Sequence, residues 1–162
     1  MGKISVKDAL RIAVETEQRG DKFYSELSRK YSDNIELREM FEFLAKDEKD
    51  HEKQFRKLLD KHGSDETEVG EVDGEFLEAV DLRKFFDKMK DIPEDLDPRD
   101  VLQIAFELER EAVLFFSTIR DILGESPELD EIIQIEKGHM TKVMKYIVNY
   151  GSRFRGMRDK WT

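Results

Sequence analysis

Two copies of the short pattern Glu-x-x-His are the residues of this chain best suited to chemistry. One copy is Glu48 with His51, and the other is Glu136 with His139. Residues three apart on a helix lie on one face, so each copy offers a carboxylate and an imidazole to one small volume. The third histidine of the chain, His62, has no glutamate three positions before it, and we expect it to lie outside any such site.

The segments that precede these two patterns indicate an internal repeat. Residues 10–24 and 102–116 match at an offset of 92 positions, and the Glu-x-x-His copies repeat at an offset of 88. The matched pairs are Leu10/Leu102, Ile12/Ile104, Ala13/Ala105, Glu15/Glu107, Glu17/Glu109, Gly20/Ala112 and Phe23/Phe115. We therefore predict one helical hairpin that occurs twice in the chain.

The first helix of each hairpin holds two glutamates, and only one of them can face a core, because residues two apart do not share a helix face. Glu17 and Glu109 lie on stripes of small and apolar side chains, which on a helix face inwards. These stripes are Ala13, Gly20 and Tyr24 in the first hairpin and Ala105, Ala112 and Phe116 in the second. Glu15 lies among basic residues instead, and we expect both Glu15 and Glu107 to face solvent.

Two Glu-x-x-His helices and two further inward carboxylates make a two-metal site when four helices pack as a bundle. The predicted metal ligands are Glu17, Glu48, His51, Glu109, Glu136 and His139. Two divalent cations would cancel the charge of the four carboxylates. Without metal, burial and mutual repulsion should raise all four carboxylate pKa values. Mixed carboxylate and imidazole ligands suit iron or manganese, although affinity alone does not exclude zinc.

Length and helix signals predict a single domain with one long connection. The predicted parts are a hairpin at 5–63, a crossover at 64–97, a hairpin at 98–151 and a basic tail at 152–162. Helix boundaries are predicted from caps and turns, and they are Ser5 to about Ser28, Asp33 or Asn34 to His62–Gly63, Asp97 to Gly124, and Ser126 to Tyr150–Gly151. The crossover should contain one or two short amphipathic helices.

The composition excludes several classes of function. A net charge of −10 argues against a nucleic-acid partner. The sequence has no cysteine, which excludes disulfides, cysteine-ligated iron–sulfur clusters and thiol catalysis within these residues. No run is long and apolar enough to span a membrane, and residues 1–8 lack the apolar core of a signal peptide, so we expect no membrane partner and a cytoplasmic protein.

Two segments bear on partners. The apolar residues of the crossover are read as packing on the bundle, with a subunit interface or a shield over the site as the alternative. The tail, which alternates basic and apolar residues, is either a solvated end or a surface that docks on an acidic neighbouring subunit or an electron donor. From both segments we expect a homodimer or larger homo-oligomer.

A more specific pattern extends the two glutamates of the first helices. Each is followed at +3 by a small residue and at +7 by an aromatic residue, as in Glu17, Gly20 and Tyr24. With this pattern and the two Glu-x-x-His copies, the chain resembles the rubrerythrin-like branch of the ferritin-like di-iron carboxylate superfamily. The resemblance implies an all-α, ferritin-like antiparallel four-helix bundle with a long crossover, containing a short helix, between helices 2 and 3.

The resemblance also implies roles for the residues of the site. Glu48 and Glu136 would each bind one metal or bridge two, the histidines would cap opposite metals, and Tyr24 would hydrogen-bond a ligand without binding metal itself. The chain departs from the family pattern in two side chains. Phe116 stands where a second tyrosine might be, and Phe106 stands where some rubrerythrins carry another glutamate.

A third departure concerns electron transfer. Rubrerythrins proper carry a four-cysteine rubredoxin domain, and no residue of this sequence could form one, so an external electron-donor protein is implied. The implied function is an oxidoreductase that reduces peroxide or dioxygen. The alternatives are an iron-binding protein that oxidises and holds iron, and a bundle whose metal site is structural or vestigial.

Overall fold

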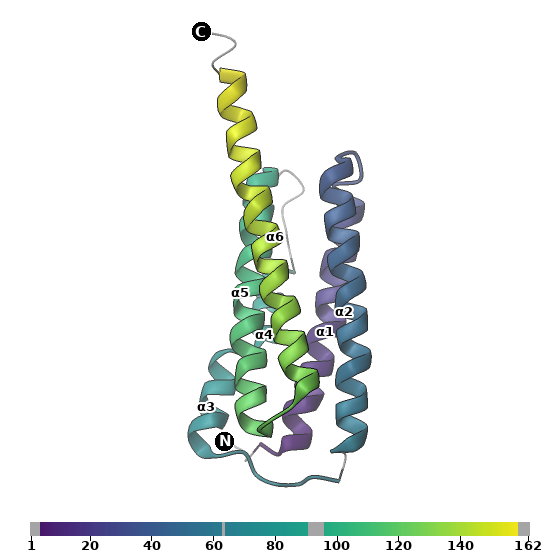
Figure 1. The fold of residues 1–162 in the computed structure, drawn as a ribbon, viewed down its shortest axis with the longest axis vertical. Coiled ribbons are helices and arrows are strands. Elements are labelled where there is room, and N and C mark those ends of the chain that lie inside the picture. The colour runs from purple at the N-terminus through teal and green to yellow at the C-terminus, as the bar shows by residue number, and fades with distance from the viewer. Residues whose placement is uncertain (1–3, 63, 91–95, 159–162) are drawn as a thin grey trace.

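A computed structural model describes residues 4–62, 64–90 and 96–158, with side chains described up to residue 149. Within these ranges the helices are α1 (Val6–Lys30), α2 (Ile35–Lys61), α3 (Glu71–Ala79), α4 (Leu82–Lys88), α5 (Pro98–Leu123) and α6 (Pro127–Arg158). The four long helices run along the longest axis of the molecule, while α3 and α4 belong to the connection between α2 and α5 (Figure 1). The predicted all-α four-helix bundle with a long crossover is confirmed.

Side-chain caps begin the two helices of the first hairpin. The Ser5 hydroxyl accepts a hydrogen bond from the Asp8 amide, and the Asp8 carboxylate accepts one from the Ser5 amide. This capping box satisfies backbone donors that the first turn of α1 leaves free. The side chain of Asn34 accepts a hydrogen bond from the Leu37 amide and begins α2. Both helix starts therefore lie where the caps predicted them.

The helix ends of this hairpin differ slightly from the prediction. Helix α1 continues past the predicted end at Ser28 to Lys30, where basic residues in the last turn favour the helix dipole. Helix α2 ends at Lys61, with His62 as its C-cap. The predicted terminating glycine, Gly63, lies outside the described residues.

The second hairpin contains one clear correction, at the end of α6. Helix α5 ends as predicted at Gly124, whose φ of 79° lies in the left-handed region that glycine tolerates. Helix α6, in contrast, passes through the predicted end at Tyr150–Gly151 and continues to Arg158, beyond the end of the other helices (Figure 1). A glycine within a helix costs only about 1 kcal/mol, so Gly151 alone does not terminate α6.

The crossover covers the bundle with apolar side chains. Four of them are buried, namely Leu77, Val80, Leu82 and Phe86. Helix α3 packs on α5, and α4 packs between α1 and α5. The ring of Phe86 meets the ring of Phe23 on α1 edge-on, with 5.9 Å between centroids. The interpretation of these residues as packing is therefore confirmed.

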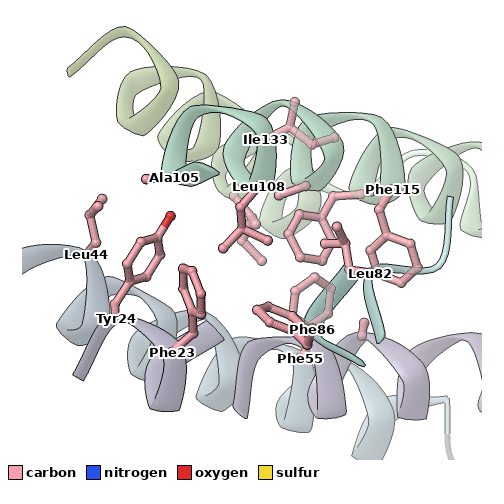
Figure 2. Packing of buried hydrophobic residues seen from close by; sticks show 14 of the residues in the cluster. Phe23, Tyr24, Leu44, Phe55, Leu82, Phe86, Ala105, Leu108, Phe115 and Ile133 are labelled. Atoms are coloured by element: carbon pink, nitrogen blue, oxygen red, sulfur yellow. The ribbon is translucent and has the colours of Figure 1, made fainter. Parts of the chain in front are cut away.

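Aromatic side chains fill much of the space between the two hairpins. Figure 2 shows Phe23 of α1, Phe55 of α2 and Phe115 of α5 converging on this space, and all three are buried. In the same view the hydroxyl of Tyr24 points from α1 towards the second hairpin. The long helices thus bury an apolar stripe each and carry charged outer faces. None of the described helices is long and apolar enough to cross a membrane.

The expected oligomer stays a prediction, and fewer apolar residues of the crossover are available for a subunit interface than the sequence indicated. Most of the apolar crossover residues that motivated it pack on their own bundle. Val72 and Phe76 remain exposed on α3. We expect light scattering across a range of concentrations to give at least twice the monomer mass, and a constant monomer mass would contradict the oligomer.

The packing of the crossover predicts unequal effects of two similar substitutions. Phe86→Ala should lower the free energy of unfolding by about 3 kcal/mol, because it leaves a cavity between α4 and α1. Phe76→Ala, on the exposed face of the same crossover, is the matched control and should change it by about 0.5 kcal/mol or less. Urea unfolding of both variants measures the difference. An equal loss for Phe76→Ala would show that its ring is buried in an interface instead.

Candidate metal centre

Six ionisable side chains converge inside the bundle, and they come from all four long helices. They are Glu17 of α1, Glu48 and His51 of α2, Glu109 of α5, and Glu136 and His139 of α6. Their potential ligand atoms form two groups, each with all atoms within 4.8 Å of one another. One group is Glu17, Glu48, His51 and Glu136, and the other is Glu48, Glu109, Glu136 and His139. Glu48 and Glu136 belong to both groups, so the groups lie next to each other.

The predicted choice of inward glutamates agrees with the structure. Glu17 and Glu109 are buried, whereas Glu107 is exposed. Glu15 departs from the expectation in one respect, because it is half-buried. Its carboxylate lies 3.1 Å from Arg19 and 3.4 Å from Arg83 of α4, so the crossover covers part of this side chain, which remains 42% exposed.

All six side chains of the centre are at least 94% buried, since Glu48, the most exposed of them, exposes 6%. Several of their polar atoms have no hydrogen-bond partner among the described residues. These atoms are Glu17 Oε2, both ring nitrogens of His51, Glu109 Oε2, both carboxylate oxygens of Glu136, and His139 Nδ1. Buried lone-pair atoms without donors are costly, and a bound cation removes that cost. The donor set therefore fits metal ions.

Glu136 lies between the two imidazoles. Its Oε1 atom is 2.7 Å from His51 Nδ1, and its Oε2 atom is 3.6 Å from His139 Nδ1. The two rings are stacked with 6.0 Å between their centroids. Glu17 and Glu109 each lie next to the histidine of their own hairpin. Glu17 Oε2 is 3.3 Å from His51 Nδ1, and Glu109 Oε2 is 3.5 Å from His139 Nδ1. Each histidine thus presents Nδ1 to the centre.

Three of the four carboxylates have the raised pKa values that we expected for the metal-free site. Burial, followed by the charge of Glu136, raises the pKa of Glu109 to about 8. Burial also raises the pKa values of Glu17 and Glu48 well above their ordinary value, and the charges of neighbouring carboxylates add to the effect. These carboxyl groups bind protons more tightly when no cation is present.

Glu136 corrects that expectation. Burial opposes its ionisation, but the close contacts of its carboxylate with the imidazoles of His139 and His51 outweigh burial and hold its pKa below the ordinary value. The same contacts act on the imidazoles in the opposite sense. Burial alone would lower the pKa of each histidine, yet Glu136 raises the pKa of His51, and Asp47 with Glu109 raises the pKa of His139. The prediction was wrong for Glu136 because it considered repulsion between the carboxylates but not the attraction between Glu136 and the two imidazoles.

Tyr24 lies where the family resemblance placed it. It is fully buried, and its hydroxyl donates a hydrogen bond of 2.6 Å to Glu109 Oε1. Burial and the charge of Glu109 raise the pKa of Tyr24, so the hydroxyl keeps its proton. The corresponding residue of the second hairpin, Phe116, has no such hydroxyl. Its ring packs against the ring of Phe55, with 5.1 Å between the ring centroids. Phe106 is half-buried against the core.

Asp47 is a residue of the site that the sequence analysis missed. Its Oδ2 atom lies 2.6 Å from Nε2 of His139, the ring nitrogen that faces away from Glu136. This hydrogen bond lowers the pKa of Asp47. The available signal was its position directly before Glu48, which places it one step around the helix from an inward ligand.

Gly20 makes room for one of the shared carboxylates. A Cβ atom at this position would lie 3.2 Å from both Cδ and Oε2 of Glu48. A small residue is therefore needed at +3 from Glu17 because a larger side chain would collide with Glu48. His62, in contrast, lies apart from both ligand groups and 4.0 Å from Asp65, as expected.

Comparison with known proteins agrees with this geometry. A family model described as rubrerythrin matches residues 8–147. The chain belongs to the rubrerythrin family. A crystal structure of a ferritin-like diiron-carboxylate protein from Thermotoga maritima is similar to this rubrerythrin-family chain, with a TM-score of 0.72, 27% sequence identity, and coverage of 91% of this chain and 97% of that one. No curated protein matches the sequence. The ferritin-like fold predicted from the sequence is confirmed, and the centre is suited to two metal ions.

The carboxyl pKa values predict how the stability of the metal-free protein depends on pH. Glu109 titrates at about 8 when folded and near 4.5 when unfolded, so its protonation favours folding as pH falls through this window. The raised histidine pKa values act in the same direction above pH 6.5. Protonation of Glu136 destabilises the fold instead, but only below pH 4.5. The melting temperature of the protein in chelator should therefore rise as pH falls from about 8.5 to about 5.

Replacing two of these carboxyl groups by amides should remove much of this dependence. At about pH 8.5 in chelator, the Glu17→Gln, Glu109→Gln double variant should melt at least about 3 °C above the wild type, a shift that corresponds to ~1 kcal/mol in a domain of this size. Glu107→Gln, on the exposed face of α5, is the control and should melt with the wild type. A double variant that melts below the wild type would contradict the burial of ionisable carboxylates.

Proposed function

We propose that the protein is a di-iron oxidoreductase that reduces peroxide or dioxygen with electrons from an external donor. The observation that carries this proposal is the pair of buried ligand groups that share Glu48 and Glu136 in a rubrerythrin-family bundle. Glu17 and His51 would hold one metal ion, and Glu109 and His139 would hold the other. The two shared carboxylates, Glu48 and Glu136, would bind one ion each or bridge the two, as the resemblance implies.

The chemistry of the donors supports iron as the metal. The centre offers carboxylate oxygens and imidazole nitrogens, which iron and manganese both accept. Two divalent ions match the charge of four carboxylates in a place where uncompensated charge is costly. Zinc would fit the same ligands but has no redox chemistry, so it would not support the proposed reaction.

Reduction of hydrogen peroxide to two water molecules consumes two electrons and two protons. When bound, the metal pair supplies the electrons. The two protons come from solvent, and the Tyr24 hydroxyl, which keeps its own proton, orients the Glu109 carboxylate through their 2.6 Å hydrogen bond. Burial of all six ligand side chains also keeps bulk water away from the reacting centre.

The electrons must come from outside these residues. The sequence contains no cysteine and therefore cannot supply a rubredoxin-type iron site of its own. We propose a separate electron-donor protein that reduces the metal pair between turnovers. An artificial reductant can replace this donor in an assay, so the chemistry can be tested before the donor is identified.

Metal content and turnover together test the proposal. Metal-free protein titrated with ferrous iron under anaerobic conditions should bind two ions per chain. Bound metal should stabilise the fold by ~4 kcal/mol at a thousandfold excess over the dissociation constant. The loaded protein should then reduce hydrogen peroxide in the presence of an artificial reductant. Glu48→Gln should bind fewer than two ions and lose turnover, whereas the surface variant Glu107→Gln should keep both.

Other outcomes separate the alternatives. Protein that binds two irons, oxidises them once and retains them without catalytic turnover would be an iron-holding protein. Protein that takes up zinc from an equal mixture of zinc and iron, and shows no turnover, would have a structural site. Protein that binds no metal would have a vestigial one.

A further inference from the structure

The two halves of the repeat contribute equally to the ligands but unequally to what surrounds them. We propose that the two metal positions differ in affinity, and that the position of Glu109 and His139 fills first and retains its ion. The position of Glu17 and His51 fills second and exchanges. This inference rests on the proposed two-metal centre. Glu48 and Glu136 are shared by both positions and so do not distinguish them.

The Glu109–His139 position has a hydrogen-bond partner on each of its own ligands. Tyr24 donates to Glu109 Oε1 at 2.6 Å, and Asp47 lies 2.6 Å from His139 Nε2. Both partners come from the first hairpin, although both ligands belong to the second. The two hairpins together therefore hold this carboxylate and this imidazole in place.

The Glu17–His51 position has neither kind of partner among the described residues. His51 Nε2 is buried and forms no hydrogen bond among these residues, whereas His139 Nε2 contacts Asp47. Among the same residues no tyrosine hydroxyl donates to Glu17, whose side chain contacts Glu48, itself one of the six predicted ligands. The repeat explains the difference. The position that corresponds to Tyr24 is Phe116, and the position that corresponds to Asp47 is Ile135. Each polar partner has thus an apolar counterpart in the other half.

These partners act on metal affinity in two ways. A carboxylate that accepts from Nε2–H of His139 fixes the tautomer in which Nδ1 presents its lone pair to the centre, and it makes that nitrogen a better donor. The charge of Asp47, whose side chain is 23% exposed, also attracts a cation. Loss of such outer hydrogen bonds lowers metal affinity by about 10- to 100-fold in comparable sites. We therefore expect the Glu109–His139 position to bind at least about tenfold more tightly.

An unequal pair has a consequence for the proposed function. Removal of one ion from the Glu17–His51 position would leave a centre with one metal still bound. Brief exposure to a chelator should therefore give protein with one metal, and a single further ion should restore the pair. A centre with two equal positions would instead pass through a mixture of both singly loaded forms.

Loading with less metal than the centre can hold tests the inference directly. Metal-free full-length protein would receive one equivalent of cobalt(II) and be crystallised, and anomalous scattering at the cobalt edge would give the occupancy of each position. If the affinities differ tenfold, one equivalent shared between two independent positions gives about threefold more cobalt at Glu109 and His139, and we expect at least this excess. Equal occupancy, or an excess at Glu17 and His51, would overturn the inference but leave the two-metal centre intact. No cobalt at either position after two equivalents would instead overturn the proposed function itself.

Reciprocal variants test whether the outer partners cause the difference. Tyr24→Phe with Asp47→Ile gives the first hairpin the residues of the second, so the occupancy ratio should fall to about one. Phe116→Tyr with Ile135→Asp supplies partners to the other position and should also reduce the ratio. Thermal melts in chelator show whether each variant folds, and Asp47→Ala with Tyr24→Phe, which removes both partners without adding bulk, serves if the isoleucine variant does not fold. A ratio that persists in a folded variant without both partners would overturn the inference.

Discussion

The burial of six ionisable side chains in an apolar bundle is the constraint on which the rest of this structure depends. Charged groups without compensation are among the most destabilising features that a core can contain. Here they occupy the interface between two hairpins, where aromatic rings and small residues exclude water. The bundle can tolerate them only if cations or protons balance their charge. Its stability and its chemistry are therefore aspects of one electrostatic problem.

The metal-free centre solves this problem with protons. Glu136 stays ionised between His51 and His139, whose pKa values it helps to raise, while the other three carboxyl groups have raised pKa values. A bound metal ion has to displace protons from these groups, so metal affinity is coupled to pH. Glu136 is the ligand that is already ionised before metal arrives. Because Glu136 belongs to both ligand groups, this carboxylate lies between the two positions at which metal would bind.

Much of the site could be predicted because helix periodicity carries the necessary information. Glu17 was separated from Glu15 by the residues on its own face, and this required no knowledge of the tertiary fold. Asp47 could not be found in the same way, because its partner His139 lies on another helix and its place beside Glu48 does not show which helix its side chain faces. The low pKa of Glu136 likewise depends on distances between helices. The end of α6 was missed because a single glycine is a weak terminator in the middle of an otherwise helical pattern.

The internal repeat also bears on symmetry. A centre assembled from two separate copies of one hairpin would have to be symmetrical, since any change in one half would appear in the other. In a single chain the halves are encoded independently, so Tyr24 can face the second half while Phe116 faces the first. The long crossover that joins α2 to α5 is the link that makes this independence possible. Covalent connection of the hairpins thus frees each metal position to be tuned by sequence on its own.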